Sequence, residues 1–223
     1  MAPIIHTVNL RKVYAVGKER VIALNDVSIS IEKGEFCCIV GQSGSGKSTL
    51  LNQLAGLEKP TRGKVFIGSH EISAMTEDEL AKFRQAHLGF IFQSYNLLPT
   101  MTAAENVALP LMFKGISRSQ RLAMARALLH DTPVYLFDEA TSNVDAESEN
   151  DIMQAIHSLA GKKTIILISH RLANVVHSDC IYAMSNGRVM EQGTHAELLA
   201  QQGAYSRLYL AQRKLETLEE EDA

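Results

Sequence analysis

The sequence contains a glycine-rich stretch, Gly41-Gln42-Ser43-Gly44-Ser45-Gly46-Lys47-Ser48-Thr49, which fits the pattern G-x-x-x-x-G-K-[ST]. The five residues before it, Phe36-Cys37-Cys38-Ile39-Val40, form an apolar run that predicts a buried strand. After it, leucines at positions 50, 51 and 54 predict a helix over residues 49–57. A strand, a glycine-rich loop and a helix in this order are the context in which the pattern binds phosphate. An ordinary Gly/Ser loop is therefore the weaker interpretation.

Each part of this loop has a chemical role in the predicted phosphate site. Its three glycines allow successive backbone N–H groups to point inward at phosphate oxygens. The N-terminus of the following helix adds partial positive charge at the same place. Lys47 can reach the outer phosphates as a point charge, and the Ser48 hydroxyl can ligate Mg²⁺. We therefore predict that residues 41–49 bind a nucleotide.

The composition is that of a globular chain and argues against several classes of partner. The 223 residues suit one domain, and a net charge of −3 gives no support to nucleic acid as a main partner. Cys37, Cys38 and Cys180 lie in apolar stretches. They predict buried thiols in a reducing compartment rather than a disulfide or a metal site. The sequence shows no signal-peptide pattern, and no apolar run approaches the roughly 18 residues that span a bilayer. We expect a protein that is soluble, or peripheral to a membrane through a partner.

Short apolar strands alternate with helices along the chain, which predicts an α/β domain. The predicted strands are 3–10, 24–31, 36–40, 64–67, 88–92, 134–137, 164–168, 180–184 and 189–192. The predicted helices are 49–57, 77–87, 103–109, 117–130, 146–159 and a C-terminal pair over 195–215. Capping boxes begin at Thr76, Thr102 and Thr194, and residues 14–18 are expected to form a loop.

Polar groups follow three of these strands, at the end where parallel strands bind ligands. They are the loop at 41–49, the pair Asp138-Glu139 and the pair Ser169-His170. Asp138 can hold Mg²⁺ together with Ser48, usually through water. Glu139 can polarise a water for attack on a γ-phosphate. The simpler alternatives are a turn acid for Asp138 and a solvated loop acid for Glu139. The convergence of strand ends is a second, independent argument for a nucleotide site.

These motifs resemble a known family. Four features look like those of the nucleotide-binding subunit of ATP-binding cassette (ABC) transporters. They are the glycine-rich loop, Gln93 at a strand end, Leu136-Phe137-Asp138-Glu139-Ala140-Thr141-Ser142 and Ile168-Ser169-His170. The resemblance covers about residues 4–213. It implies the P-loop NTPase fold of ABC type, with an N-terminal antiparallel β subdomain and with ATP and Mg²⁺ as ligands. It also implies a homodimer that works with membrane-spanning transporter subunits at the cytoplasmic face of the cell membrane. The transported substrate would be a property of those subunits.

The resemblance also implies roles for single residues. Tyr14 would stack on the adenine, a contact worth roughly 1–3 kcal/mol, although it could also be an ordinary half-buried tyrosine. Gln93 would contact Mg²⁺ and the attacking water, and residues 94–100 would face the membrane subunit. Ser142-Asn143-Val144-Asp145 would cross to a second copy. His170 would contact the γ-phosphate, and its position directly after a buried strand favours this role over a structural one.

The sequence departs from the family pattern before Asp138. The family carries a Leu-Ser-Gly-Gly-Gln signature there, but this chain has Lys114-Gly115-Ile116-Ser117-Arg118-Ser119-Gln120-Arg121, in which only the serine at 117 and the glutamine at 120 correspond. The interval from Gln93 to Asp138 is also short for the family. We therefore expect one domain over residues 1–215 with a truncated helical subdomain at about 94–130. An acidic tail would follow at 216–223, either frayed or, as the favoured interpretation, a solvated helix end without function.

The two halves of the chain resemble different branches of the family. Residues up to about 118 look like subunits of the lipoprotein-release and macrolide-export type, which serve separate membrane proteins. From about 122 onward, the chain resembles exporters in which membrane and nucleotide domains are fused. Two segments carry this resemblance, Ser169-His170-Arg171-Leu172 and Glu191-Gln192-Gly193-Thr194-His195. Such a junction is compatible with a natural deletion, a recombination event or an engineered sequence.

Three functions are compatible with these observations. The first is an ATPase subunit that drives export. The family signature supplies donors to the γ-phosphate of the ATP held by the opposite subunit. Because this chain lacks the signature, we expect Mg-ATP binding with weak or absent cooperative hydrolysis. The second is a nucleotide-binding but hydrolysis-deficient subunit with a regulatory or vestigial role. The third is a soluble ATPase of the same fold that acts on DNA or ribosomes, against which the acidic balance argues.

Overall fold

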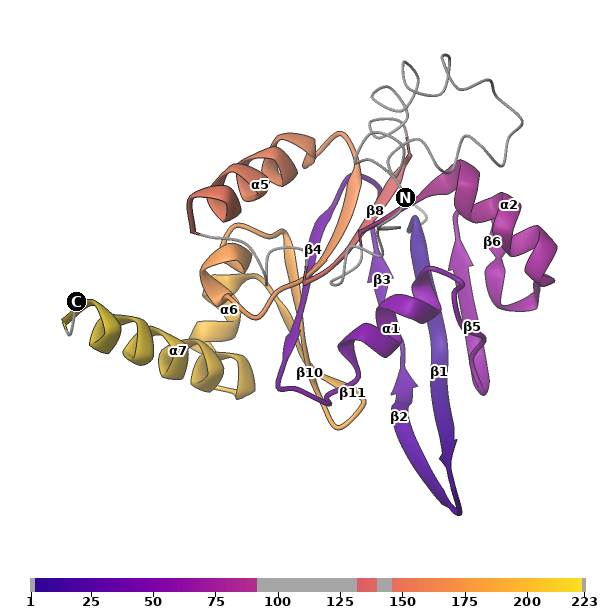
Figure 1. Cartoon of the computed structure of the whole chain (residues 1–223), viewed down its shortest axis with the longest axis horizontal. Coiled ribbons are helices and arrows are strands. Elements are labelled where there is room, and N and C mark those ends of the chain that lie inside the picture. The colour runs from indigo at the N-terminus through magenta and orange to yellow at the C-terminus, as the bar shows by residue number, and fades with distance from the viewer. Residues whose placement is uncertain (1–2, 92–131, 140–145, 222–223) are drawn as a thin grey trace, which may run out of the picture.

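The computed structural model describes residues 3–91, 132–139 and 146–221, and these residues form two sheets with helices on either side of the larger one (Figure 1). The strands are β1 (Ile5–Val16), β2 (Glu19–Val27), β3 (Ser30–Ile31), β4 (Phe36–Gly41), β5 (Arg62–Ile67), β6 (His70–Glu71), β7 (Leu88–Ile91), β8 (Val134–Asp138), β9 (Thr164–Ile168), β10 (Cys180–Ser185) and β11 (Arg188–Gly193). The helices are α1 (Lys47–Leu54), α2 (Glu77–His87), α5 (Ala146–Leu159), α6 (His195–Ala200) and α7 (Ala204–Glu221), with short 3-10 helices η1 (Ile72–Ala74) and η2 (Leu172–Val175).

The larger sheet places the carboxyl ends of β4, β8 and β9 side by side. Among the described residues its order is β11-β10-β4-β9-β8-β7, and all neighbours are parallel except the β10–β11 hairpin. The registers pair Ile39 with Ile168 and Asp138 with Ile168 across β9. β4, β8 and β9 are nearly continuous apolar runs because helices or the second sheet cover both of their faces.

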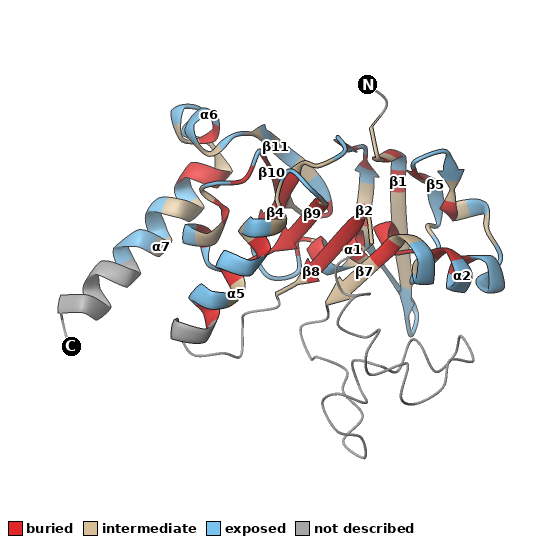
Figure 2. Cartoon of the chain, turned by 90° about the horizontal axis from the view of Figure 1, so that it is seen from above, coloured by how far each residue is buried: buried red, intermediate tan, exposed pale blue. Residues whose placement is uncertain are grey.

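Two hydrophobic cores lie on opposite faces of this sheet. One core packs α1, α2 and the antiparallel sheet β2-β1-β5-β6 against residues such as Cys37 and Ile39. The other packs α5, α6 and α7 against residues such as Cys38 and Val40. Figure 2 shows the red buried strands between these two layers. The adjacent cysteines therefore point to opposite faces and are both buried, as the strand alternation predicts.

The described elements confirm most of the predicted ones and correct two. The capping boxes at Thr76 and Thr194 begin α2 and α6, as predicted. The expected loop at 14–18 is wrong, because β1 runs to Val16 and pairs with β2, which leaves only Gly17 and Lys18 as the turn. The expected strand over 24–31 is interrupted after Val27. The acidic tail is helical through Glu221 as part of α7, which agrees with a helix end, and its fraying stays a prediction.

Several predictions concern residues outside the described ranges. They are Gln93, the truncated helical subdomain at 94–130, the departure from the signature at 114–121 and the loop at 142–145. Within the ranges that the structure covers, no helix combines the length and the apolar character needed to cross a membrane.

Candidate nucleotide site

The glycine-rich loop joins β4 to α1 and is held against the neighbouring backbone. A Cβ on Gly41 would lie 2.3 Å from the carbonyl oxygen of Met184, and one on Gly46 would lie 2.5 Å from that of Ala23. Gly46 also has a φ of 101°, in the left-handed region that favours glycine. The Gly187 N–H donates to the Ser45 carbonyl at 3.0 Å. The β10–β11 turn and β2 thus fix the path of the loop, which explains why glycine is needed at these positions.

Lys47 lies across this loop rather than out in solvent. Its residue is only 5% exposed, and its Nζ donates to the carbonyl oxygens of Gly41 at 3.0 Å and Gln42 at 3.1 Å. Burial lowers the pKa of Lys47, while the carboxylates of Glu139 and Asp138 act in the opposite direction. A buried ammonium held between loop carbonyls and two carboxylates is suited to an anionic ligand.

Ser48 and Asp138 bring two oxygen ligands together at the start of α1 and the end of β8. The Ser48 hydroxyl donates to Asp138 Oδ1 at 3.2 Å. Burial raises the pKa of Asp138, as does the neighbouring Glu139 carboxylate, whereas the Ser48 hydrogen bond lowers it. A hydroxyl and a carboxylate are the hard oxygen donors that Mg²⁺ prefers, and Mg²⁺ usually takes only one or two carboxylates beside phosphate and water. The donor chemistry of this pair therefore fits Mg²⁺.

Glu139 and His170 form a second polar pair beside the first. His170 Nε2 lies 2.5 Å from Glu139 Oε1, and the Glu139 side chain is only 11% exposed. The Glu139 N–H donates to the Ile168 carbonyl at 3.1 Å, which ties the ends of β8 and β9 together. Glu139 has a φ of 50°, an uncommon conformation for a non-glycine residue that costs on the order of 1 kcal/mol. The fold thus holds a carboxylate and an imidazole in contact at the sheet edge.

These groups surround one cleft of about 540 Å³. It is lined by Val21, Ile22, Ala23, Ser43, Gly44, Gly46, Lys47, Ser48, Thr49, Glu139 and His170. Most residues of the sequence-predicted loop and both residues of the carboxylate–imidazole pair therefore line this cleft. Asp138 is connected to it by the hydrogen bond from Ser48. Sequence reasoning missed the contribution of β2. The available signal was the apolar Val21-Ile22-Ala23 run, in which Val21 and Ile22 remain 47% and 44% exposed.

Tyr14 is near this cleft but is not one of its lining residues. Its hydroxyl donates to Glu58 Oε2 at 2.6 Å, and Lys12 Nζ lies 3.1 Å from the same oxygen and 5.1 Å from the centre of the Tyr14 ring. Burial, followed by the hydrogen bond to Glu58, raises the pKa of Tyr14 to about 12. Tyr14 pairs with Val21 across the β1–β2 ladder. Its role as an adenine platform stays a prediction.

The fold and the site together define a nucleotide-binding protein of the P-loop class. A sequence profile of the ABC transporter family matches residues 24–121. An uncharacterised ABC transporter ATP-binding protein of Thermotoga maritima is 36% identical in an alignment 221 positions long, which covers 85% of this chain and 94% of that protein. The chain therefore belongs to the family of ABC transporter ATP-binding proteins, and the resemblance found in its sequence is confirmed.

Two further comparisons describe its place among relatives. The macrolide export ATP-binding/permease protein MacB of Hyphomonas neptunium is 35% identical, over 90% of this chain but only 36% of that longer protein. The ATP-binding cassette MJ0796 of Methanocaldococcus jannaschii, solved as a dimer in a post-hydrolysis state bound to ADP and Pi, superposes with a TM-score of 0.78. That match has 33% sequence identity and covers 85% of this chain and 98% of that one. The predicted ABC ATPase fold is thereby confirmed.

Proposed function

We propose that the chain binds Mg-ATP in the loop cleft and hydrolyses it to drive export through partner membrane subunits. One observation carries the proposal. A buried ammonium, a hydroxyl–carboxylate pair and a carboxylate–imidazole pair adjoin the same cleft at the carboxyl ends of parallel strands. These are the groups that phosphoryl transfer to water requires: a phosphate cradle, ligands for the metal and a base for the nucleophile.

Binding would rest on the loop and on α1. The backbone N–H groups of residues 41–49 and the Lys47 ammonium would hold the phosphates. Ser48 and Asp138 would hold Mg²⁺, together with Gln93 as the family resemblance implies. The metal ion supplies neutralisation of charge on the phosphate oxygens. The β2 residues Val21 and Ile22 would give an apolar wall to the base and ribose.

Hydrolysis would rest on the second polar pair. Glu139 would accept a proton from the attacking water, since it lines the cleft and follows the proposed metal ligand Asp138 directly. His170 Nε2, in contact with Glu139 Oε1, would orient that carboxylate. As the family resemblance implies, His170 would also lie beside the γ-phosphate. The positive φ of Glu139 aims its side chain away from the regular strand path and is retained because β9 fixes the backbone.

The partners follow from the kinds of relatives. The MacB relative combines an ATP-binding part and a permease in one chain, whereas the matched part of this chain corresponds to the ATP-binding share. The dimeric MJ0796 cassette supports a homodimer. We therefore propose ATP-bound homodimers that act at the cytoplasmic face of the cell membrane on separate membrane-spanning subunits. No nucleic acid partner is proposed.

A second function is favoured by one observation. The segment at 114–121 lacks the Gly-Gly of the family signature. In an intact dimer this signature would add donors to the γ-phosphate from the opposite subunit, and losing one such donor typically costs about 100- to 1,000-fold in rate. The chain could thus bind Mg-ATP as a regulatory subunit without useful turnover. The two functions share the same in-cis site and differ only in the step after binding.

Two measurements distinguish these functions. The first is steady-state phosphate release by the wild-type protein with Mg-ATP. A rate that is abolished by Glu139→Gln supports the ATPase. The second is gel filtration of Glu139→Gln with and without Mg-ATP, in which dimerisation that depends on ATP supports an assembled composite site. Binding of Mg-ATP without phosphate release and without dimerisation supports the regulatory function. Absence of Mg-ATP binding contradicts both.

A further inference from the structure

The segment that carries His170 is held by side chains from two helices that lie outside the cleft. It runs from Ser169 through η2 to Val175, directly after β9. His170 itself is half exposed, with a side chain that is 51% accessible. Its contact with Glu139 therefore depends on how the surrounding backbone is fixed rather than on burial of the imidazole.

The first anchor is local. The Ser169 hydroxyl accepts a hydrogen bond from the Arg171 N–H at 3.1 Å and donates to the Arg171 carbonyl oxygen at 3.0 Å. Ser169 is only 7% exposed. The hydroxyl thus closes a tight turn whose central residue is His170. This turn sets the local shape of the segment but does not tie it to the rest of the domain.

The second anchor is Glu149 on α5. Its side chain is 4% exposed, and its two carboxylate oxygens receive the Arg171 guanidinium and, at 2.9 Å, the Asn174 amide. A carboxylate buried to this degree costs several kcal/mol unless it is paired and hydrogen-bonded. Here both of its partners come from the segment that carries His170. The burial of Glu149 is therefore coupled to the position of that segment.

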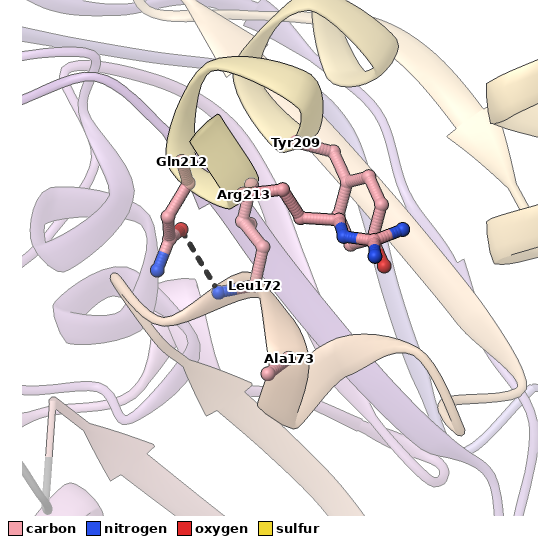
Figure 3. Close-up of a pocket in the computed structure, with 5 residues that line it drawn as sticks. All are labelled: Leu172, Ala173, Tyr209, Gln212 and Arg213. Atoms are coloured by element: carbon pink, nitrogen blue, oxygen red, sulfur yellow. Dashed lines mark hydrogen bonds between the residues drawn. The ribbon is translucent and has the colours of Figure 1, made fainter. Parts of the chain in front are cut away.

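The third anchor is Gln212 on α7. Its Oε1 accepts a hydrogen bond from the Leu172 N–H at 3.1 Å, which Figure 3 shows as a dashed line. The first N–H groups of a helix have no partner within the helix, so Gln212 caps η2 from outside. The contact lies at a cavity of about 360 Å³ lined by Leu172, Ala173, Tyr209, Gln212 and Arg213. Gln212 thus reaches the His170 segment beside a space rather than within a packed core.

We infer that Glu149 and Gln212 are positioning residues that hold the His170 segment so that the imidazole meets Glu139. The inference rests on the proposed function, in which this pair acts beside the γ-phosphate. It assigns to α5 and α7 a role in setting the geometry of the cleft without touching the nucleotide. Each anchor acts through the backbone or neighbours of His170, at Arg171, Leu172 and Asn174.

A spectroscopic double-mutant cycle without nucleotide tests this inference. The ring signals of His170 are recorded by NMR on ¹⁵N-histidine-labelled protein and assigned by their loss in His170→Gln. In the wild-type background, Glu139→Gln is expected to shift these signals because the partner of Nε2 changes. In the Glu149→Ala and Gln212→Leu backgrounds the same substitution is expected to produce less than half of that shift. The matched controls are Asp151→Ala and Gln201→Leu, which remove an exposed carboxylate on α5 and an exposed glutamine at the end of α6, and they should retain the full shift.

A full shift in folded Glu149→Ala and in Gln212→Leu overturns the inference. If Glu149→Ala does not fold, Gln212→Leu decides alone, because Gln212 is only partly buried. A merely structural loss of stability would lower the unfolding temperature without uncoupling His170 from Glu139. Calorimetry in a separate experiment tests Mg-ATP binding by the wild-type protein. Its absence would contradict the proposed function while leaving the NMR outcome for the anchors interpretable.

Discussion

The phosphate side of the cleft is built from charged groups that the fold largely buries, whereas the β2 side is built from apolar groups that it leaves exposed. Lys47 is 5% exposed and the Glu139 side chain 11%, while Val21 and Ile22 are 47% and 44% exposed. On the first side, glycine backbone, strand ends and hydrogen bonds fix each group. On the second side, the register of an antiparallel hairpin brings the residues to the cleft.

In the proposed function, this difference separates specificity for phosphate from contact with the rest of the ligand. A buried ammonium between two loop carbonyls interacts strongly with an anion, because water does not screen it fully. An exposed isoleucine contributes only the apolar area that a ligand covers. We therefore expect substitutions on the phosphate side to change affinity or turnover by orders of magnitude, and those on the β2 side to change affinity by small factors.

The largest effect is expected for Lys47→Ala. Hydrogen bonds to charged groups are worth about 1.5–3 kcal/mol, so the loss of the ammonium should weaken Mg-ATP binding by on the order of 100-fold. Isothermal titration calorimetry measures this change. Lys33→Ala, which removes an exposed lysine outside the cleft, should bind as the wild type does. Equal affinity of Lys47→Ala and Lys33→Ala would show that the loop is not the phosphate site.

The next effect concerns turnover rather than binding. Glu139→Gln keeps the size of the side chain but removes the base, and general-base catalysis contributes about 100- to 10,000-fold. We expect single-turnover phosphate release to fall by a factor in that range while Mg-ATP affinity changes little. Glu77→Gln, at an exposed position in the first turn of α2, is the control. Unchanged release in Glu139→Gln would remove the carboxylate–imidazole pair from the mechanism.

The phosphate side could be predicted from the sequence because each of its parts is local. The pattern at 41–49 specifies the loop, and short apolar runs place Asp138 and His170 at strand ends, where a parallel sheet gathers them. The buried strands β4, β8 and β9 follow for the same reason. The Ser48–Asp138 and Glu139–His170 pairs then result from the parallel register.

The β2 side could not be predicted, because it depends on pairing between segments. The sequence predicts a loop at residues 14–18, between two expected strands. In the structure the backbone ladder to β2 continues the strand and carries Val21 and Ile22 to the cleft. The anchors Glu149 and Gln212 were also missed, since their partners lie 25 and 40 residues away in the sequence and no motif links them.

A smaller effect tests the β2 side directly. Ile22→Ser should weaken the binding of Mg-ATP and Mg-ADP by the same factor of about five, which corresponds to roughly 1 kcal/mol of lost apolar contact. The factor is common to both because β2 would contact the base and ribose rather than the γ-phosphate. Val16→Ser is the matched control, since Val16 is 61% exposed in the same hairpin and does not line the cleft. Weaker binding of Mg-ATP with unchanged binding of Mg-ADP would instead place Ile22 on the phosphate side.

The smallest effect concerns the stability of the protein without ligand. Burial raises the pKa of Asp138 above its usual value, so the folded state binds a proton more readily than the unfolded state. Stability linked to this group is therefore lost as pH rises from the ordinary aspartate pKa through the raised one. Asp138→Asn keeps an oxygen for the Ser48 hydrogen bond but removes the buried charge. In metal-free buffer at pH 7.5 it should unfold at a temperature higher by on the order of 1 °C, because about 1 kcal/mol shifts a domain of this size by only about 2–4 °C and solvent partly screens the carboxylate.

Thermal unfolding of the wild type and Asp138→Asn across pH measures this stability difference. The difference should narrow as pH falls through the ordinary pKa of aspartate, because below it the wild-type carboxyl is neutral in both the folded and the unfolded state. Added Mg²⁺ with ATP should reverse its sign, because only the wild type offers the metal a carboxylate oxygen at this position. The residues that β2 contributes to the cleft are apolar and do not titrate. The stability difference between wild type and Ile22→Ser should therefore not change with pH or with the metal ion in this way. A stability difference between wild type and Asp138→Asn that stays constant from acid to neutral pH would show that burial of this carboxylate is not what distinguishes the phosphate side.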